Sequence, residues 1–384
     1  MKQSLISVFF IFLTLKLFGQ VLPEPLTQNL QQISEGKTLP GFAVSIVNTD
    51  SIIYSHSFGF SDISTKRPFT DETILNIGSV SKTFVGVALV KAVEQGYLTL
   101  NSNINDFLPF KVENPYFPDE PITIRHLVTH TSGIIDREKI YKRTYTKVLD
   151  AGDFKQFLKE YLSKEGKAYS SKNFSNHKPG AWQEYSNIGS TLAAYVIESA
   201  TKMPFDKYTN NNIFEPLKLQ ATSWFFKDID KSQHAILYNS KQKAIPLYSL
   251  LTYPDGGLKS NLHDLSIYLQ EIIKGYSGKG LLLSDSAYSM LFQSQFGGSF
   301  KPENISPKEP NIGIFWVHRK NGEIGHTGGD PGITAFLFFN PKTATGRIFI
   351  TNTLLEKSEQ IKVFSEIWRL LREYEEKITT ANKG

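Results

Sequence analysis

Hydrophobic and polar positions along the chain predict two β-rich ends around a helical middle. Residues 41–47 and 51–60 are apolar-rich runs separated by a polar turn, which predicts an antiparallel hairpin. Strand patterns return late in the chain, at residues 312–317, 323–329, 335–340 and 347–352. Strands at both ends with helices between them favour an α/β fold of the α+β type, with one antiparallel sheet built from both termini and flanked by helices.

Helical periodicity dominates the remainder. It is seen at residues 26–36, 84–95, 124–130, 150–163, 188–200, 204–217, 262–273 and 357–377. The segment 84–95 is apolar around most of its circumference, so we expect a buried helix. Residues 164–182 are polar and predict an exposed loop. We expect one domain over 21–384, with an α/β lobe of about 21–75 and 311–384 and a mostly helical lobe of about 76–310.

The first twenty residues have the layout of a secretory signal peptide. A short basic start precedes the apolar run 5–18, and Gly19 and Gln20 follow. The run is short for a membrane span, so we expect cleavage near residue 20 and a secreted or periplasmic protein without a stable membrane span. A retained N-terminal anchor is the alternative. Because the chain contains no cysteine, a lipoprotein anchor and disulfide bonds are excluded.

Charge and motifs exclude several classes of function. The formal net charge of +5 falls to 5 − 2 = +3 without Lys2 and Lys16, too little to indicate a nucleic-acid partner. The eight histidines form no zinc-protease motif and thiolates are absent, so we expect no metal. There is no Gly-x-Ser-x-Gly elbow, P-loop or dinucleotide fingerprint, so we expect no cofactor and no α/β-hydrolase.

Candidate chemistry begins at Ser79 and Lys82, which open the buried helix. Positions i and i+3 share one helix face, so a hydroxyl and an amine are held side by side where free N–H groups also point outward. A serine nucleophile needs a base and an oxyanion donor, and this stretch offers both. The pattern alone is common by chance, because Ser is a good N-cap and Lys an ordinary helix residue.

Two further motifs follow in order, Tyr185-Ser186-Asn187 and His326-Thr327-Gly328. Taken singly, Tyr185 is typical of a half-buried aromatic and Asn187 of a helix N-cap, while Gly328 and Gly329 indicate a turn or bulge. Together with Ser79 and Lys82, their order and spacing resemble the penicillin-recognising serine hydrolases: serine β-lactamases, DD-peptidases and related esterases. The Tyr-x-Asn form is similar to class C β-lactamases and their DD-carboxypeptidase and esterase relatives.

Other segments extend the resemblance over nearly the whole chain after residue 20. They are 89–109, 127–133, 179–180, 214–217, 256–258 with 264–265, and 325–332. Within 127–133 we expect a structural helix end at His130, closed by Gly133. The family resemblance implies a β-lactamase/transpeptidase-like fold and chemistry that proceeds through an acyl-enzyme.

The resemblance also implies the roles of individual residues. Ser79 would attack a carbonyl carbon, with Lys82 against Ser79 and Tyr185. Whether Lys82 or Tyr185 is the general base stays open. Asn187 would hold the substrate amide and orient Lys82, and the N–H groups of Ser79 and Gly329 would form the oxyanion hole on an edge strand.

In the third motif, His326, Thr327 and Gly328 would contact the substrate. His326 stands where most β-lactamases carry lysine, and an unperturbed histidine is mostly neutral at pH 7. The interpretation is a serine hydrolase acting on a small amide or ester, above all a D-amino-acid-containing peptide such as a cell-wall peptide. The alternatives are a class C-like β-lactamase and a non-hydrolytic penicillin-binding sensor or scaffold. We expect specificity to lie in the loops 110–121, 164–182 and 296–311.

Overall fold

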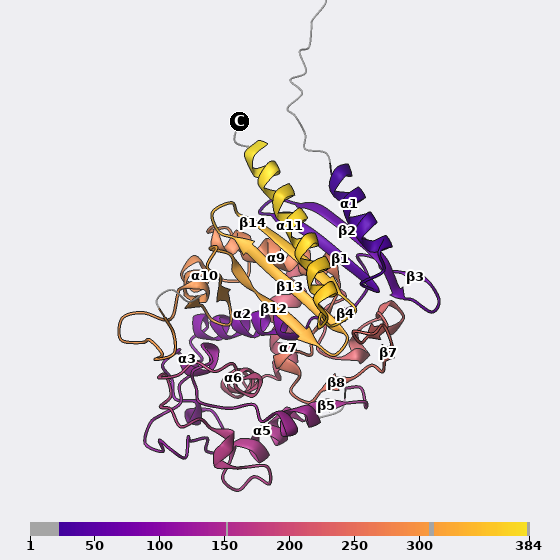
Figure 1. Ribbon diagram of the computed structural model, residues 1–384. Coiled ribbons are helices and arrows are strands. Elements are labelled where there is room, and N and C mark those ends of the chain that lie inside the picture. The colour runs from indigo at the N-terminus through magenta and orange to yellow at the C-terminus, as the bar shows by residue number, and fades with distance from the viewer. Residues whose placement is uncertain (1–22, 151–152, 307–310, 382–384) are drawn as a thin grey trace, which may run out of the picture.

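A large antiparallel sheet crosses the molecule, as expected from the sequence (Figure 1). The computed structural model describes residues 23–150, 153–306 and 311–381, so the predicted signal peptide lies outside the described residues. The eight strands run in the order β10-β11-β12-β13-β14-β1-β2-β3. Their bounds are β1 Gly41–Asn48, β2 Ile52–Asp62, β3 Arg67–Pro68, β10 Asn311–Ile312, β11 Val317–His318, β12 Ile324–Asp330, β13 Ile333–Asn340 and β14 Thr345–Thr351.

The two ends of the chain meet in the middle of this sheet. Strand β1 pairs with β14 from Phe42 opposite Thr351 to Asn48 opposite Thr345. On its other side β1 pairs with β2, which confirms the predicted hairpin. Elsewhere in the described part of the chain, short strands pair two by two: β4 Leu75–Asn76 with β9 Lys259–Ser260, β5 Tyr145–Thr146 with β8 Ser249–Leu250, and β6 Leu237–Tyr238 with β7 Ala244–Ile245.

Helices cover both faces of the sheet. Their bounds are α1 Glu24–Glu35, α2 Ser81–Glu94, α3 Ile124–Val128, α4 Glu138–Tyr141, α5 Phe154–Leu162, α6 Asn187–Thr201, α7 Phe205–Thr209, α8 Glu215–Leu217, α9 Leu262–Tyr276, α10 Asp285–Phe292 and α11 Ser358–Ala381. The terminal helices α1 and α11 lie on one face and α9 lies behind the other (Figure 1). No helix among the described residues is both long and apolar enough to cross a bilayer.

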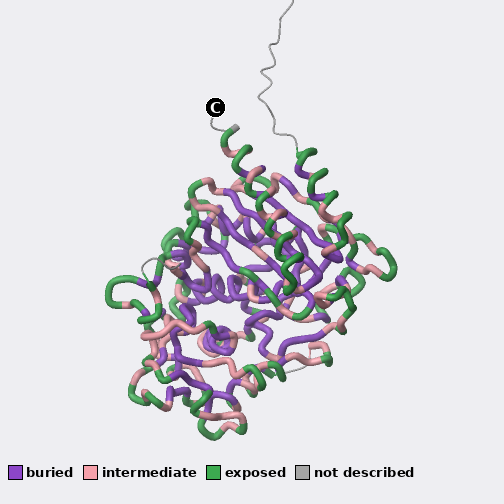
Figure 2. Tube along the Cα trace, in the orientation of Figure 1, coloured by how far each residue is buried: buried purple, intermediate pink, exposed green. Residues whose placement is uncertain are grey.

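Burial follows this layering (Figure 2). Strand β1 faces both layers: Phe42 and Val44 pack with α1 and α11, whereas Ala43 and Val47 join the main core around α2. Helix α2 is buried along almost its whole length, as expected from apolar residues around most of its circumference. The helix that follows the candidate nucleophile is therefore fixed on nearly all sides.

Three segments differ from the sequence-based expectations. Residues 312–317 form two short strands with a turn between them, because Phe315 takes a left-handed conformation with φ 58°. The expected single helix 204–217 contains a π-helical turn at Asn210–Phe214. The loop 164–182 is only partly exposed, because Asn173 and Phe174 are buried.

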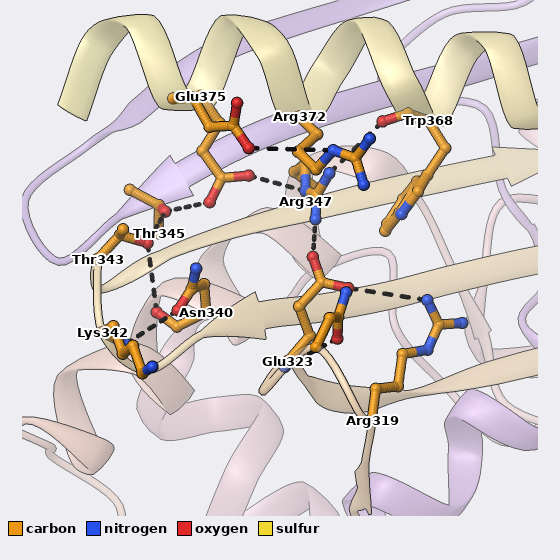
Figure 3. Close-up of polar contacts among 12 residues, drawn as sticks. Arg319, Glu323, Asn340, Lys342, Thr343, Thr345, Arg347, Trp368, Arg372 and Glu375 are labelled. Carbon is orange, nitrogen blue, oxygen red and sulfur yellow. Dashed lines mark hydrogen bonds and ion pairs between the residues drawn. The ribbon is translucent and has the colours of Figure 1, made fainter. Parts of the chain in front are cut away.

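A buried charge network fastens α11 to the sheet (Figure 3). Arg347 on β14 forms ion pairs with Glu323, which immediately precedes β12, and with Glu375 on α11, where Nε lies 2.8 Å from Oε2. Its guanidinium also stacks 4.6 Å from the ring centroid of Trp368, and Thr345 donates a hydrogen bond to Glu375. Arg347 serves both carboxylates, and Glu323 also has a longer ion pair of 3.8 Å with Arg319 (Figure 3). Arg347 therefore connects β14, α11 and the residue before β12.

Candidate active site

Ser79 lies in a single 3₁₀ turn, Gly78–Val80, that leads directly into α2 at Ser81. The expected helix start is therefore a tighter turn followed by the α-helix. Gly78 has φ +53°, a left-handed conformation that glycine adopts without strain. Lys82 Nζ donates a hydrogen bond of 3.0 Å to Ser79 Oγ. The neighbouring Ser81 faces elsewhere, since its Oγ accepts from the N–H of Leu258.

Lys82 is fully buried and surrounded by acceptors. Besides Ser79 Oγ, its Nζ donates to Asn187 Oδ1 at 2.7 Å and to the carbonyl of Asp255 at 2.5 Å. These three acceptors match the three N–H bonds of an ammonium group. A buried ammonium is tolerated only when its donors are satisfied, so the arrangement fixes Lys82 against Ser79.

The second motif lies at the N-terminus of α6. Asn187 is the first residue of that helix, and Ser186 caps it by accepting from the N–H of Gly189. Tyr185 is 46% exposed, and Lys82 Nζ lies 5.0 Å from the centroid of its ring. The ring packs on the buried His130, with centroids 4.4 Å apart. The ring of Tyr185 therefore packs on His130, while nearly half of the residue is open to solvent.

The third motif lies on β12, directly against the turn that carries Ser79. A Cβ at Gly328 would lie 2.0 Å from the carbonyl oxygen of Ile77 and 3.2 Å from the backbone nitrogen of Ser79. A Cβ at Gly78 would lie 2.9 Å from the backbone nitrogen of Gly329. Glycine is required for this close approach. It brings the two expected oxyanion donors, the N–H groups of Ser79 and Gly329, into one small region.

Strand β12 is an edge strand only in part. It pairs with β13 from Ile324 to Asp330, but with β11 only at Ile324 and Gly325. From His326 onward, its other side has no strand partner among the described residues. Thr327 and Gly329 are exposed there, so the backbone is accessible to a substrate where the motif lies.

His326 is buried and neutral at pH 7. Burial, with a further contribution from the nearby charge of Lys82, lowers the pKa of His326 to about 4. Its Nδ1 lies 2.6 Å from the carbonyl oxygen of Thr327, so Nδ1 carries the proton and Nε2 is left as an acceptor. The motif consequently offers no fixed positive charge at His326.

Three aspartates that the sequence analysis missed support this site. Asp136 accepts hydrogen bonds from Ser186 Oγ, at 2.8 Å, and from the backbone N–H groups of Asn187 and Ile188, at 2.6 and 3.0 Å. It therefore fixes the start of α6.

Asp255 is the second, and its carbonyl holds Lys82. Its buried carboxyl accepts from the hydroxyls of Tyr141 and Thr191, and burial raises its pKa to about 7. The third, Asp330, ends β12 and accepts from the hydroxyl of Tyr145. Single acids carry no spacing signal, so only the fold reveals these contacts.

His130 not only lies beyond the end of a helix but also contacts the second motif. Its Nδ1 accepts from the N–H of Ser186 at 3.3 Å, and burial keeps its pKa well below the usual value. A neutral ring thus packs under Tyr185. Among the described residues, no cluster of three or more His, Cys, Asp or Glu is arranged to hold a metal ion.

Comparison with known proteins identifies the family of this chain. The sequence model of the Beta-lactamase family matches residues 26–367, so the chain belongs to that family. This is a family of serine hydrolases, and membership supports hydrolase chemistry at the site just described.

Individual relatives are distant. "Protein flp" of Staphylococcus aureus (strain MRSA252) is 25% identical over 326 residues, covering 82% of this chain; the chain spans only 60% of the length of that relative. "Beta-lactamase" of Yersinia enterocolitica is 23% identical over 376 residues, covering 89% of this chain and 90% of the relative.

Among solved structures, the octameric penicillin-binding protein homologue from Pyrococcus abyssi superposes with a TM-score of 0.68. It is 22% identical, and the match covers 90% of this chain and 77% of that one. This likeness establishes the β-lactamase/transpeptidase fold.

Proposed function

We propose that the protein hydrolyses a small amide or ester through an acyl-enzyme on Ser79, above all in a D-amino-acid-containing peptide. The observation that carries the proposal is the contact of Lys82 Nζ with Ser79 Oγ, at 3.0 Å. This contact lies where the backbone of β12 at Gly328 and Gly329 packs against the turn of Ser79. A nucleophile, a cation and two N–H donors converge there, as acyl transfer requires. A short cell-wall peptide is a substrate of this class. We also propose export of the protein, on the basis of the signal-like residues 1–20.

The hydrogen bonds of Lys82 indicate whether Lys82 or Tyr185 accepts the proton of Ser79. Lys82 uses all three N–H bonds as a donor, so in this resting geometry it cannot also accept the proton of Ser79. We therefore assign proton acceptance to Tyr185, whose ring lies over Lys82. As Ser79 Oγ attacks the carbonyl carbon, its proton passes to the phenol oxygen of Tyr185. The phenol gives its own proton to the amine or alcohol that departs when the bond from the carbonyl carbon to the leaving group breaks. Water then attacks the ester by the same route in reverse.

The neutral His326 argues against an efficient β-lactamase. A β-lactam carries a carboxylate, and this motif supplies no fixed cation at His326 to bind it. The similarity to the Yersinia enterocolitica protein keeps β-lactam hydrolysis as a second candidate. A non-hydrolytic sensor or scaffold is a third, although a pure binder has no need of both Lys82 and Tyr185.

A substrate panel tests the proposal. Wild-type protein should be labelled by a fluorescent penicillin and should cleave 4-nitrophenyl esters or D-Ala-D-Ala peptides, with nitrocefin turned over slowly or not at all. Ser79→Ala should abolish labelling and cleavage, whereas the neighbouring Ser81→Ala should retain both. Rapid nitrocefin turnover would instead establish a β-lactamase. Labelling without any turnover would favour the sensor, and neither labelling nor ester cleavage would refute the proposal.

A further inference from the structure

A pocket of about 710 Å³ opens beside Gly329, at the end of the third motif. Its walls are mainly apolar and aromatic, and they come from α4, β5 and the segment before β8. They include Tyr141, Tyr145, Tyr248, Ile245, Leu247 and Leu354. None of the three loops expected to set specificity contributes to this lining. A pocket of this size suits a small-molecule group.

The direction of β12 shows which part of a substrate would enter the pocket. Tyr185 lies beside the start of the motif, with its ring centroid 6.4 Å from that of His326. The leaving group must receive its proton there, so it lies toward His326. Gly329 holds the oxyanion, and the strand advances by roughly 3.3 Å per residue. The acyl group therefore continues past Gly329 toward Asp330 and the pocket.

Asp330 contributes the charged group of the pocket. Its Oδ1 accepts from the hydroxyl of Tyr145. Its Oδ2 faces Gly256, where a Cβ would come within 2.9 Å, so the absence of a side chain at Gly256 leaves room for the carboxylate. Among the described residues no Lys, Arg or His forms an ion pair with Asp330. Lys142 and Lys147 line the pocket. Lys142 is paired with Glu138, and neither lysine forms an ion pair with Asp330.

The groups around Asp330 leave its charge without a direct partner. The titratable groups that interact electrostatically with it include Lys82, Tyr141, Tyr145, Tyr248 and Asp255. The charged residues Glu138, Lys142 and Lys147 also line the pocket. Lys82 already serves three other acceptors, and the tyrosines and Asp255 add no positive charge. Burial raises the pKa of Asp330 to about 6, which leaves it ionised at pH 7. A carboxylate without a counter-ion in an apolar pocket is stabilised by a cation that arrives with the ligand.

We propose that Asp330 selects substrates whose acyl group carries a free ammonium group, with an apolar or aromatic body packed against Tyr145 and Tyr248. The chemical class is that of aminoacyl amides and esters with an unblocked amine. This inference rests on the proposed acyl transfer at Ser79 and specifies its substrate. Asp330 acts here as a specificity-determining residue, and the aromatic walls favour the cation further.

Matched substrates test the assignment. The 4-nitroanilides and 4-nitrophenyl esters of D- and L-phenylalanine are compared with their N-acetyl forms and with 3-phenylpropanoyl analogues, which lack the amine. Wild-type enzyme should prefer the free amine by about 10- to 100-fold in kcat/KM, the range of a charge-assisted hydrogen bond. Asp330→Asn keeps the shape and should bring the ratio close to one, mainly through KM. Asp153→Asn, an acid-to-amide change on the surface cap of α5, should keep the ratio.

Hydrolysis of 4-nitrophenyl acetate tests the acyl transfer at Ser79 separately from the role of Asp330, because the acetyl group has neither the amine nor the aromatic group. A circular dichroism spectrum and a thermal unfolding midpoint close to those of the wild type would show that Asp330→Asn is folded. If wild-type protein cleaves acetate in a Ser79-dependent way but does not prefer the free amine, the assignment of Asp330 is overturned and the proposed function stands. The same holds if Asp330→Asn leaves the ratio unchanged. If no ester or amide is cleaved through Ser79, both proposals fail.

Discussion

Asp136 is expected to control the geometry of the catalytic groups without touching the substrate. Its carboxylate receives three hydrogen bonds at the start of α6, the helix that carries Asn187. Asp136→Asn keeps the size of the side chain and one acceptor oxygen. That oxygen can still serve Ser186 and Ile188, but an NH₂ group then faces the N–H of Asn187, where the carboxylate oxygen now lies at 2.6 Å.

The expected loss follows from this donor–donor contact. One charge-assisted hydrogen bond contributes about 1.5–3 kcal/mol, and an unsatisfied buried donor costs about 1–3 kcal/mol. We therefore expect a loss of about 3 kcal/mol of unfolding free energy. For 384 residues the entropy of unfolding is roughly 0.8 kcal/mol/K, which makes the fall in Tm about 4 °C. A shift of Asn187 also displaces Lys82, so kcat/KM should fall by about 10- to 100-fold.

The assay combines thermal unfolding with hydrolysis of 4-nitrophenyl acetate. Asp153→Asn is the control, because Asp153 caps α5 at an exposed site and Asn caps a helix as well as Asp does. It should change neither quantity. If Asp136→Asn retains wild-type Tm and kcat/KM, then the start of α6 is held by other contacts and this account of the site is wrong.

Three further predictions concern other parts of the molecule. The pKa of His326 is about 4 in the folded protein and about 6.5 when unfolded, so its contribution to stability is present above pH 6.5 and is lost as the pH falls toward 4. His326→Gln should therefore reduce the loss of unfolding free energy between pH 7 and pH 4.5 by about 2.5 kcal/mol, measured by urea unfolding at both pH values; an unchanged loss would contradict it. Gly328→Ala should lower kcat/KM by about 100-fold or more, because its Cβ would clash with the carbonyl of Ile77 and separate the oxyanion donors; wild-type kinetics would refute the close contact. Arg347→Met should cost about 3–5 kcal/mol in urea unfolding, because it removes the paired cation of the buried Glu375 and leaves Glu323 only its longer ion pair with Arg319. The kcat/KM of the folded fraction should stay the same, and an unchanged unfolding free energy would show that the network is not stabilising.

The sequence motifs predicted which residues come together at the candidate site, because each motif is short and tied to one local geometry. Ser79 and Lys82 lie one helical turn apart, and Gly328 permits an approach that no other residue allows. Such local constraints on residue type can be recognised in the sequence alone. The antiparallel sheet was likewise predictable, since its long strands carry an apolar pattern.

The features that were not predicted depend on tertiary contacts between unrelated segments. Asp136 and Asp330 acquire their roles from partners that lie 50 residues or more away in the chain, as in the contact of Asp136 with Ser186. The pocket walls come in part from β5 and β7, two-residue strands too short to show periodicity. The expected strand 312–317 failed at Phe315, because the left-handed backbone there depends on its packing beside His130 and not on its residue type.

The pairing of β1 with β14 has a consequence for how the protein comes into existence during synthesis. Phe42 and its partner Thr351 are 309 residues apart (351 − 42), so this sheet cannot close on the ribosome until nearly the whole chain has emerged. Contacts of such separation fold slowly and leave apolar surface, including that of α2, transiently exposed to chaperones and aggregation. The backbone of Ser79 likewise meets that of Gly329 only after residue 329 has been made. If the proposed acyl transfer is right, a nascent or prematurely terminated chain carries Ser79 without its second oxyanion donor, so hydrolytic activity would begin only when synthesis is almost complete.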